Sequence, residues 1–405
     1  MSYGIFFSFS VFFKPLQNEF GCSRALTSGV FSVHTVVYSI SSIIMGRMID
    51  RFGSRLMLGL SACFIGVGMI LSGYSRNIWD LYIYYGVVAS IGSGVVWTLP
   101  TVTITEWFER NKGLALGISF SGIGLGSVVL SPLSDYLIRL YDWRIALLIM
   151  GCAFWLLLLI LAILVLVDSP AKLGLKPYGA RMNLDDHAGT LSVSKGQSQP
   201  RNERGQKKGW SRNEAIKTKS FWQAYAVHLF SCFPLVMVMV HIVPFATDRG
   251  ISSITAASAL GLAGLFSILG RIVLGASSDK IGFKNGIFFS SSACVLTLVW
   301  LMFTRNTWML YVFSIVFGFF YGGRAPLLPG LIGEFFGARS LGELIGLLTT
   351  AYAIAGLAGP LFAGYAFDKT GSYYLAFGLA TMSYAASAIF AFYIRPPRKE
   401  TEHSM

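Results

Sequence analysis

The sequence predicts an all-α polytopic membrane protein, with twelve transmembrane helices arranged as two pseudo-symmetric bundles of six. Three observations predict this fold class: the composition, a series of apolar segments, and a repeat that relates the two halves of the chain. Hydrophobic residues make up 54% of the 405 residues and charged residues make up 13%. Soluble domains carry about 25% charged residues, so this chain has too little charge for a surface that faces water on all sides.

The apolar segments are close to the length of a transmembrane helix, which needs about 20 residues to cross the hydrocarbon core. Several are longer, which leaves room for tilt. The charges are concentrated between segments, above all in residues 170–219. The twelve segments are residues 1–18, 25–49, 55–74, 79–107, 112–135, 144–167, 220–246, 253–278, 285–303, 308–336, 340–367 and 373–394.

The repeat is clearest in two loops that lie 229 residues apart. Residues 46–55 read GRMIDRFGSR and residues 275–284 read GASSDKIGFK, so both fit the pattern GxxxD[RK]xGx[RK]. Each loop follows one apolar segment and precedes another. The match continues downstream, where Gly113 corresponds to Gly342 at the same offset. A charged, glycine-containing loop at the same place in each half predicts two repeats of six helices.

The domain boundaries follow from these segments. We expect an N-terminal bundle over 1–168, a flexible cytoplasmic loop over 169–219, a C-terminal bundle over 220–395 and a cytoplasmic tail over 396–405. The loop is rich in Gly, Ser, Gln and basic residues, a composition typical of a flexible tether. The repeat offset also suggests that the first helix lacks residues at its front; a short first helix is the alternative.

The net charge of +13 is explained by its placement rather than by a nucleic-acid partner. When alternate loops are assigned to opposite sides, the side with both duplicated loops holds 22 Lys and Arg residues and the other side holds seven. By the positive-inside rule the first side is cytoplasmic. We therefore expect a multi-pass protein of the plasma (inner) membrane, with both termini in the cytoplasm and the lipid bilayer as its surroundings.

Nothing in the chain predicts an enzyme, a metal site or a cofactor. The five cysteines lie far apart with no CxxC spacing. No GxxxxGK[ST] run is present to bind ATP phosphates, and the membrane segments hold no nucleophile–base set or metal cluster. Energy for transport would therefore come from gradients of ions or of the cargo.

The duplicated loops resemble the signature of the major facilitator superfamily. Three further stretches resemble the branch that holds monocarboxylate porters and oxalate–formate antiporters: WFERNKGLALG at 107–117, DWR at 142–144 and VFFK at 11–14. The resemblance covers the whole chain except the central loop. It implies two six-helix domains around a midplane cavity that opens alternately to either side of the membrane.

The resemblance also implies that the duplicated loops are cytoplasmic latches, which tune the conformational equilibrium and do not bind cargo. The latch residues expected on this basis are Asp50, Arg51, Arg55, Asp279, Lys280 and Lys284.

Ionisable side chains inside the membrane are the first candidates for a cargo site, because each costs about 2.5–3.5 kcal/mol or more to insert. Arg271 lies eight residues before Asp279, and Arg324 lies ten residues before Glu334. At 1.5 Å per residue these arginines are about 12 Å and about 15 Å from the cytoplasmic end of their helices. No acid, Asn or Gln lies near the midplane, so cation and sugar cargoes are disfavoured.

We expect Arg271 to bind the carboxylate of an anionic cargo, because the guanidinium fork matches a carboxylate with two hydrogen bonds. It also matches the helix 8 arginine that binds substrate in the resembled branch. Hydrogen bonds to backbone carbonyls or snorkelling to the cytoplasmic face are the alternatives. Arg324 is a second cargo candidate, for which packing or gating is equally open. Tyr321 lies one turn from Arg324 and could cap the bound anion.

The remaining cargo candidates are Tyr352, Phe7 and Trp97, which suit a small cargo with one charged end and an apolar remainder. The chain departs from the resembled branch at three places. Phe7 stands where mammalian proton-coupled carriers have a lysine in the first helix. The helix with Tyr352 has no base before Lys369, where oxalate carriers add a lysine. Ser267 stands where mammalian proton-coupled carriers have an Asp four residues before the helix 8 arginine.

Two histidines away from helix ends, His241 and His34, are the candidates for carrying a proton, because histidine titrates near physiological pH. Helix packing is the alternative for both. The sequence as a whole predicts a secondary active transporter of small monocarboxylates such as lactate or pyruvate, working by proton symport and alternating access. Exchange of organic anions of the oxalate–formate type and a transporter-like anion sensor are the alternative functions.

Overall fold

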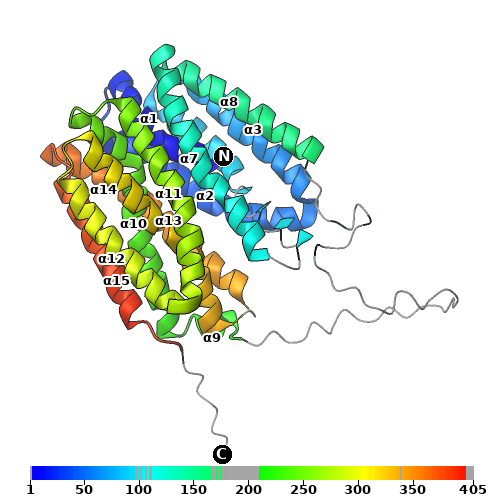
Figure 1. The fold of residues 1–405 in the computed structure, drawn as a ribbon. Helices are drawn as coiled ribbons and strands as arrows, with labels where there is room; N and C mark the ends of the chain where they lie inside the picture. The colour runs from blue at the N-terminus through cyan, green and yellow to red at the C-terminus, as the bar shows by residue number, and fades with distance from the viewer. Residues whose placement is uncertain are drawn as a thin grey trace, which may run out of the picture.

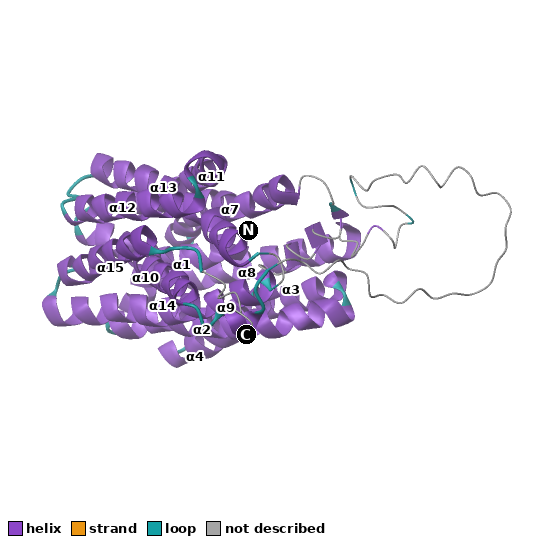
Figure 2. Ribbon diagram, turned by 90° about the horizontal axis from the view of Figure 1, so that it is seen from below, coloured by secondary structure: helices purple, strands orange, loops and turns teal. Residues whose placement is uncertain are grey.

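A computed structural model describes residues 2–95, 99–100, 103–104, 107–108, 112–165, 170, 174, 178, 209–337 and 340–397 of the chain. These residues form long helices that run roughly parallel to one another (Figure 1). No strand occurs in the described part, where the extended pairings are two isolated bridges (Figure 2).

Each half of the chain contributes its own group of helices. The helical elements of the N-terminal half are α1 (Ser2–Phe20), α2 (Arg24–Phe52), α3 (Ser54–Gly73), α4 (Ile78–Ile83), the π-helical turn η1 (Tyr84–Ala89), α5 (Ser90–Ser93), α7 (Lys112–Leu140), α8 (Trp143–Ile160) and the π-helical turn η2 (Leu161–Val165). The elements after the central loop are α9 (Arg212–Ala215), α10 (Lys219–Asp248), α11 (Ser253–Ile281), α12 (Phe283–Met302), α13 (Thr307–Phe336), α14 (Leu341–Thr370) and α15 (Tyr374–Tyr393).

The helices coincide with the twelve predicted segments. Among the described residues, nine helices are long and apolar enough to cross a membrane. The three other predicted segments correspond to α1, to α7 and to the broken run of α4, η1 and α5. Large apolar side chains cover the outside of the bundle, as shown by the exposed fractions of Leu164 (76%) and Leu296 (71%). Such a surface is unfavourable in water and suits lipid.

The repeat in the sequence is also a repeat in backbone geometry. Gly53 separates α2 from α3 with φ 86° and ψ 158°, and Gly282 separates α11 from α12 with φ 83° and ψ 149°. Each glycine N–H donates to a carbonyl four residues back at 2.8 Å. The caps Asn77 and Asn306, also 229 residues apart, both have φ −144°. The same turns therefore join the helices of both halves.

The halves meet along two seams, α2 against α14 and α7 against α11 (Figures 1 and 2). Glycines allow these helices to approach closely. A Cβ on Gly356 of α14 would collide with the side chain of Thr35 on α2. On the other seam, a Cβ on Gly124 of α7 would collide with the carbonyl oxygen of Gly264 on α11. Backbone-to-backbone packing of this kind leaves few interlocking side chains between the halves.

We expect Gly53→Ala and Gly282→Ala each to lower the melting temperature of the purified protein. Both glycines have positive φ, where a residue with a Cβ is strained by roughly 1–2 kcal/mol. Gly59→Ala is the matched control, because Gly59 lies inside α3 and an added Cβ meets nothing within 4 Å. Equal melting temperatures for all three variants would contradict this account of the duplicated loops.

Candidate functional site

Three of the predicted cargo residues come together on helices of the C-terminal half. Arg271 lies on α11, Tyr321 on α13 and Tyr352 on α14. The charge of Arg271 acts on the Tyr321 hydroxyl, and Tyr321 is in turn within electrostatic range of Tyr352. Tyr321 is 8% exposed, whereas Arg271 and Tyr352 are half-buried. We call these three residues the Arg271 group.

The Arg271 group is next to the N-terminal half. Tyr352 is within electrostatic range of Tyr38, which lies on α2 across the α2–α14 seam. Tyr38 is itself buried. A ligand held by the Arg271 group would therefore be near both halves of the protein, as alternating access requires.

Small residues bring Arg271 close to Tyr321. A Cβ on Gly322 of α13 would lie 2.5 Å from the Ser267 side chain on α11, and one on Gly323 would lie 2.7 Å from the carbonyl oxygen of Gly270. Two helices can approach this closely only where a glycine, which has no Cβ, stands at the point of contact. The Gly-Gly pair after Tyr321 therefore fixes α13 directly against the turn of α11 that carries Arg271.

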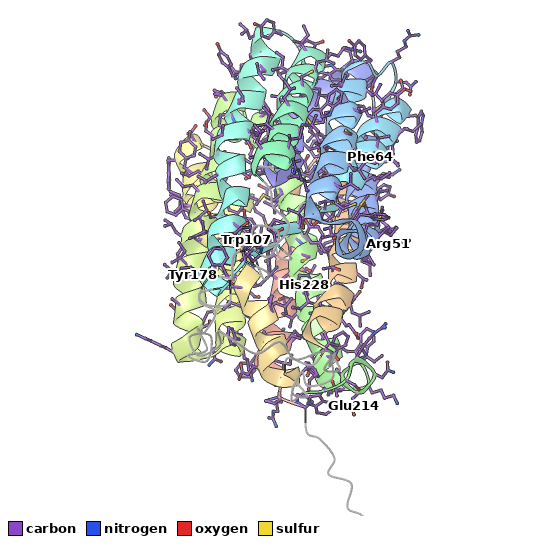
Figure 3. All side chains as sticks on the ribbon, turned by 90° about the vertical axis from the view of Figure 1, so that its right-hand side faces the viewer. Arg51, Phe64, Trp107, Tyr178, Glu214 and His228 are labelled. Carbon is purple, nitrogen blue, oxygen red and sulfur yellow. The ribbon has the colours of Figure 1, made fainter. Side chains whose placement is uncertain are left out.

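Arg324 lies outside the Arg271 group. Its guanidinium carbon is 5.9 Å from the ring centroid of Tyr384 on α15, and its charge acts on His228 and Cys232 of α10. Figure 3 shows His228 inside the bundle. Tyr321 is thus placed to act with Arg271, although its spacing of three residues had suggested that it acts with Arg324.

The last two cargo candidates are not placed by the structure. Trp97 lies outside the described residues, and for Phe7 the description covers the helical backbone of α1 but not the side chain. Their part in the cargo site remains a prediction.

The predicted latch residues lie around the duplicated loops. The side chains of Asp50 and Asp279 are outside the described residues, and Lys280 is exposed. The guanidinium carbon of Arg51 lies 5.3 Å from the centroid of the Phe52 ring, and Lys284 Nζ lies 5.9 Å from the centroid of the Phe392 ring. Arg55 Nη2 donates a hydrogen bond to the Ile163 carbonyl at 2.6 Å. Arg51 is seen on the outside of the bundle in Figure 3.

His241 is fully buried between three helices. Its Nδ1 lies 3.0 Å from the Tyr373 hydroxyl, and its Nε2 lies 3.0 Å from the Pro360 carbonyl of α14. A carbonyl can only accept, so Nε2 carries the proton and Nδ1 accepts from Tyr373. The Phe13 ring of α1 packs on the imidazole at 5.1 Å. His241 therefore has contacts with both halves.

His34 is buried within the N-terminal half. Its Nδ1 donates to the Tyr85 carbonyl at 2.9 Å, and the two rings lie 4.8 Å apart. Tyr85 belongs to η1. These contacts fit the packing role that was left open for this residue.

The strongest polar contacts between the halves were not among the predicted site residues. Asp248 ends α10 and accepts from Lys14 Nζ at 2.7 Å and from Arg24 Nη1 at 2.6 Å. Lys14 and Arg24 belong to the N-terminal half. The Arg24 side chain is buried, so its attraction to the carboxylate is weakly screened.

Arg24 has further partners in the C-terminal half. Its Nη1 donates to the Tyr373 hydroxyl at 2.6 Å, and its guanidinium carbon lies 3.6 Å from the centroid of the Phe367 ring. The Asp368 carboxylate accepts the backbone N–H groups of Arg24 and Ala25, both at 2.8 Å, which caps the start of α2. We call Lys14, Arg24, Asp248, Asp368 and Tyr373 the interdomain clasp.

The clasp lies at the end of the bundle opposite the duplicated loops. Its residues flank the connections between α1 and α2, between α10 and α11, and between α14 and α15. One feature of the sequence could have indicated the clasp: basic residues lie beside the first of these connections, and acidic residues lie beside the other two. The structure is therefore closed at this end.

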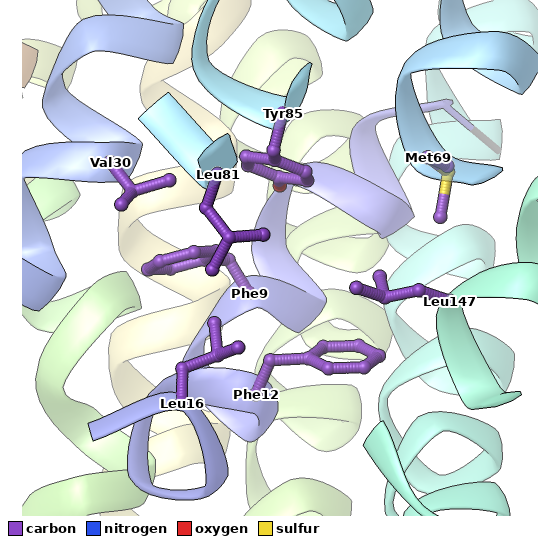
Figure 4. A pocket seen from close by; sticks show the side chains of 8 residues that line it. All are labelled: Phe9, Phe12, Leu16, Val30, Met69, Leu81, Tyr85 and Leu147. Atoms are coloured by element: carbon purple, nitrogen blue, oxygen red, sulfur yellow. The ribbon is translucent and has the colours of Figure 1, made fainter. Parts of the chain in front are cut away.

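The apolar pocket in Figure 4 is separate from the Arg271 group. Its lining comes from the N-terminal half alone, with Phe9 and Tyr85 stacked at 5.4 Å on one side. The lining residues are Phe9, Phe12, Leu16, Val30, Met69, Leu81, Tyr85 and Leu147. None is charged, so the pocket offers nothing to bind a carboxylate and is a gap in the packing of that bundle.

Comparison with known families decides what the bundle is. The family model of the Major Facilitator Superfamily matches residues 1–307 and 278–404, which is almost the entire chain. The chain belongs to the major facilitator superfamily. As a member of this superfamily it is a multi-pass membrane transporter and not an enzyme, and the predicted fold of two six-helix bundles is confirmed.

Curated relatives of this superfamily member include Monocarboxylate transporter 12 of Rattus norvegicus, which is 27% identical over 396 residues, or 94% of this chain and 79% of the relative. The uncharacterized MFS-type transporter YcxA of Bacillus subtilis is 26% identical over 419 residues, or 98% of this chain and 93% of the relative. These relatives agree with the branch that the sequence resembles.

Among solved structures, the fold is similar to a bacterial homologue of the human lysosomal transporter Spinster. The inward-facing, occupied form of that protein aligns with a TM-score of 0.66 at 14% identity, covering 96% of this chain and 93% of the other. At this identity the likeness concerns the fold alone.

We expect Asp248→Asn to open the end of the transporter that carries the interdomain clasp. The change removes two charged contacts, and loss of a hydrogen bond to a charged group costs about 1.5–3 kcal/mol, so the open population should rise about tenfold or more. Double electron–electron resonance between spin labels at Tyr74 and Arg305, two exposed positions at this end, should show longer distances than in the unmodified protein.

Asp142→Asn is the control for this experiment, because Asp142 pairs with Arg144 at 3.8 Å inside one half. Asparagine at position 142 can still cap α8. If the Asp248 variant and this control give the same distance distribution, the clasp does not hold the two halves together.

Proposed function

We propose that this protein transports small monocarboxylates such as lactate or pyruvate by proton symport and alternating access. The observation that carries the proposal is the Arg271 group, in which the charge of Arg271 acts on the Tyr321 hydroxyl and Tyr321 is within electrostatic range of Tyr352, beside the interface between the halves. The names of the monocarboxylate transporter relatives support the same class of cargo.

In this proposal Arg271 binds the carboxylate with its two parallel N–H groups. The Tyr321 hydroxyl, which already lies in the field of Arg271, donates a further hydrogen bond to the anion. Tyr352 is within electrostatic range of both Tyr321 and Tyr38, which belongs to the other half. A cargo with one carboxylate and a short apolar end fits a single guanidinium surrounded by aromatic rings better than a cargo with several charges.

Alternating access follows from the two seams and the clasp. The halves can rock along glycine-lined seams, and the clasp must break for the end that carries it to open. The distribution of Lys and Arg supports an orientation in which the duplicated loops and both termini are cytoplasmic. In that orientation the clasp is on the outer side of the plasma (inner) membrane, and the duplicated loops are on the cytoplasmic side.

His241 is the better of the two candidates for the coupled proton. The His241 imidazole is hydrogen-bonded to the Tyr373 hydroxyl, which accepts a hydrogen bond from Arg24. The carboxylates of Asp248 and Asp368 are the negative charges beside this series of hydrogen bonds. A proton added at Nδ1 would replace the hydrogen bond that Tyr373 donates. The proton state of His241 would then change a bond that belongs to the clasp, whereas His34 has its polar contact within one half.

We expect Arg271→Gln to lower uptake of labelled L-lactate into proteoliposomes at least about tenfold, because a charged hydrogen-bonding group is lost. Arg271→Lys should retain part of the activity, since it keeps the charge but not the fork. Arg76→Gln, at an exposed arginine between α3 and α4, is the control. Normal uptake by the Arg271→Gln protein would remove the assigned cargo site.

The same vesicles distinguish symport from exchange. Uptake that increases with an inward acid gradient supports symport. Uptake that ignores the gradient and requires anion inside the vesicle would identify an organic-anion exchanger of the oxalate–formate type. Binding of lactate without any uptake would identify an anion sensor.

We expect His241→Gln to abolish acid-driven accumulation of lactate while exchange of labelled for unlabelled lactate continues. Glutamine can still donate to the Pro360 carbonyl but cannot carry a proton. Tyr373→Phe is the companion variant, which keeps the imidazole and removes its link to Arg24. If the acid gradient stimulates the His241→Gln protein as strongly as the unmodified protein, the proton travels by another route.

A further inference from the structure

Arg324 is a buried charge inside the C-terminal bundle. Its residue is 7% exposed. Among the described residues, neither an ion pair nor a hydrogen bond reaches the guanidinium, whose one close contact is the Tyr384 ring at 5.9 Å. An arginine side chain stays protonated in proteins, so burial cannot be relieved by loss of a proton. Such a charge is costly unless something negative accompanies it.

The neighbours of Arg324 come from three other helices. They are His228 and Cys232 on α10, Cys294 on α12 and Tyr384 on α15, and each senses the Arg324 charge. No carboxylate of the described residues takes part in these interactions. The His228 ring is 3.6 Å from the Cys232 sulfur. Imidazole, thiol and phenol groups can donate hydrogen bonds but do not neutralise a guanidinium at neutral pH.

A second buried group is poorly satisfied at the same place. The Tyr384 hydroxyl is completely enclosed, and its partner among the described residues is the Cys294 thiol, a weak hydrogen-bonding group that does not meet normal hydrogen-bond geometry. A buried hydroxyl without a partner costs about 1–3 kcal/mol. A single anion that accepts from both the guanidinium and the phenol would satisfy both groups.

The backbone explains why Arg324 points here and not toward the Arg271 group. Gly322 and Gly323 lie against Ser267 and Gly270 of α11. The next residue is rotated by 100° around the helix, which turns Arg324 away from α11 and into the space that α10, α12 and α15 enclose. His228 is partly exposed and marks the side from which a small ion could enter.

We propose that Arg324 and Tyr384 form a second anion-binding site, separate from the Arg271 group, which takes one small anion of carboxylate or halide size between α10, α12, α13 and α15. The anion is either an inorganic ion or, if the cargo is a dicarboxylate in place of the monocarboxylate proposed above, the second acidic group of that cargo. This site does not depend on the proposed cargo, because it is defined by residues other than the Arg271 group.

The test measures thermal unfolding of the full-length protein in detergent, with sodium gluconate replaced stepwise by chloride, bromide or formate. We expect a saturable rise in melting temperature with the small anions. Arg324→Gln should raise the half-saturating concentration at least about tenfold, and Tyr384→Phe about threefold or more. Arg271→Gln is the comparison variant for the cargo site, and Arg76→Gln, at an exposed arginine outside both groups, is the matched control that should leave the half-saturating concentration unchanged.

The variants also identify the source of the anion. Stabilisation by chloride that depends on Arg324 and not on Arg271 identifies an inorganic ion. Stabilisation that requires a dicarboxylate such as malonate and is lost in both arginine variants identifies a second acidic group of the cargo. A melting temperature that is independent of the anion, or a dependence that is unchanged in both Arg324→Gln and Tyr384→Phe, would overturn the proposal. Tyr384→Phe keeps the shape of the side chain, so it remains informative if Arg324→Gln does not fold.

Discussion

A guanidinium inside a membrane must be matched by a negative or strongly polar partner, because it cannot become neutral by losing a proton. Three buried or half-buried arginines meet this constraint in different ways. Arg24 is matched within the protein, by Asp248 from the other half. Arg271 acts on the Tyr321 hydroxyl near the interface, where the proposed anionic cargo would complete its surroundings. Arg324 is enclosed among groups without negative charge. The positions of the three arginines thus separate the structural role of Arg24 from the cargo-binding role proposed for Arg271 and the ion-binding role proposed for Arg324.

The contacts between the halves divide into two kinds with different consequences. At the glycine-lined seams the helices approach closely, as Gly124 does against Gly264. Each seam also has a hydrogen bond between the halves, from Ser32 Oγ to the Leu357 carbonyl on one and from Arg139 Nη2 to Ser253 Oγ on the other. The interdomain clasp is directional, since it joins charged atoms at 2.6–2.8 Å at one end of the bundle. A structure with close helix packing along its seams and strong polar contacts at one end is suited to alternate between two conformations, each closed at a different end.

The sequence predicted the fold almost completely, because membrane spans and a 229-residue repeat are written in composition and spacing. It also placed Arg271 and Arg324 at a similar depth. It could not predict where they point. Tyr321 and Arg324 are three residues apart and share a helix face by spacing, yet the close approach at Gly322 directs one toward α11 and the other toward α15. The clasp was missed because Lys14 and Asp248 meet only through the packing of separate bundles. Such a contact depends on the relative position of the halves, which no local pattern contains.

The clasp and His241 share one group, the Tyr373 hydroxyl. This hydroxyl accepts a hydrogen bond from Arg24 and donates one to His241, so its single O–H proton points toward His241 in the present conformation. If Arg24 leaves when this end opens, the hydroxyl oxygen is free to accept instead, and a protonated imidazole becomes a suitable donor for it. Opening of the end and protonation of the histidine therefore favour one another through a single atom. A linkage of this kind needs no charged residue at the membrane midplane, where the sequence has no acid, and it would supply the proton route of the proposed symport in a chain whose Ser267 replaces the aspartate of the resembled carriers.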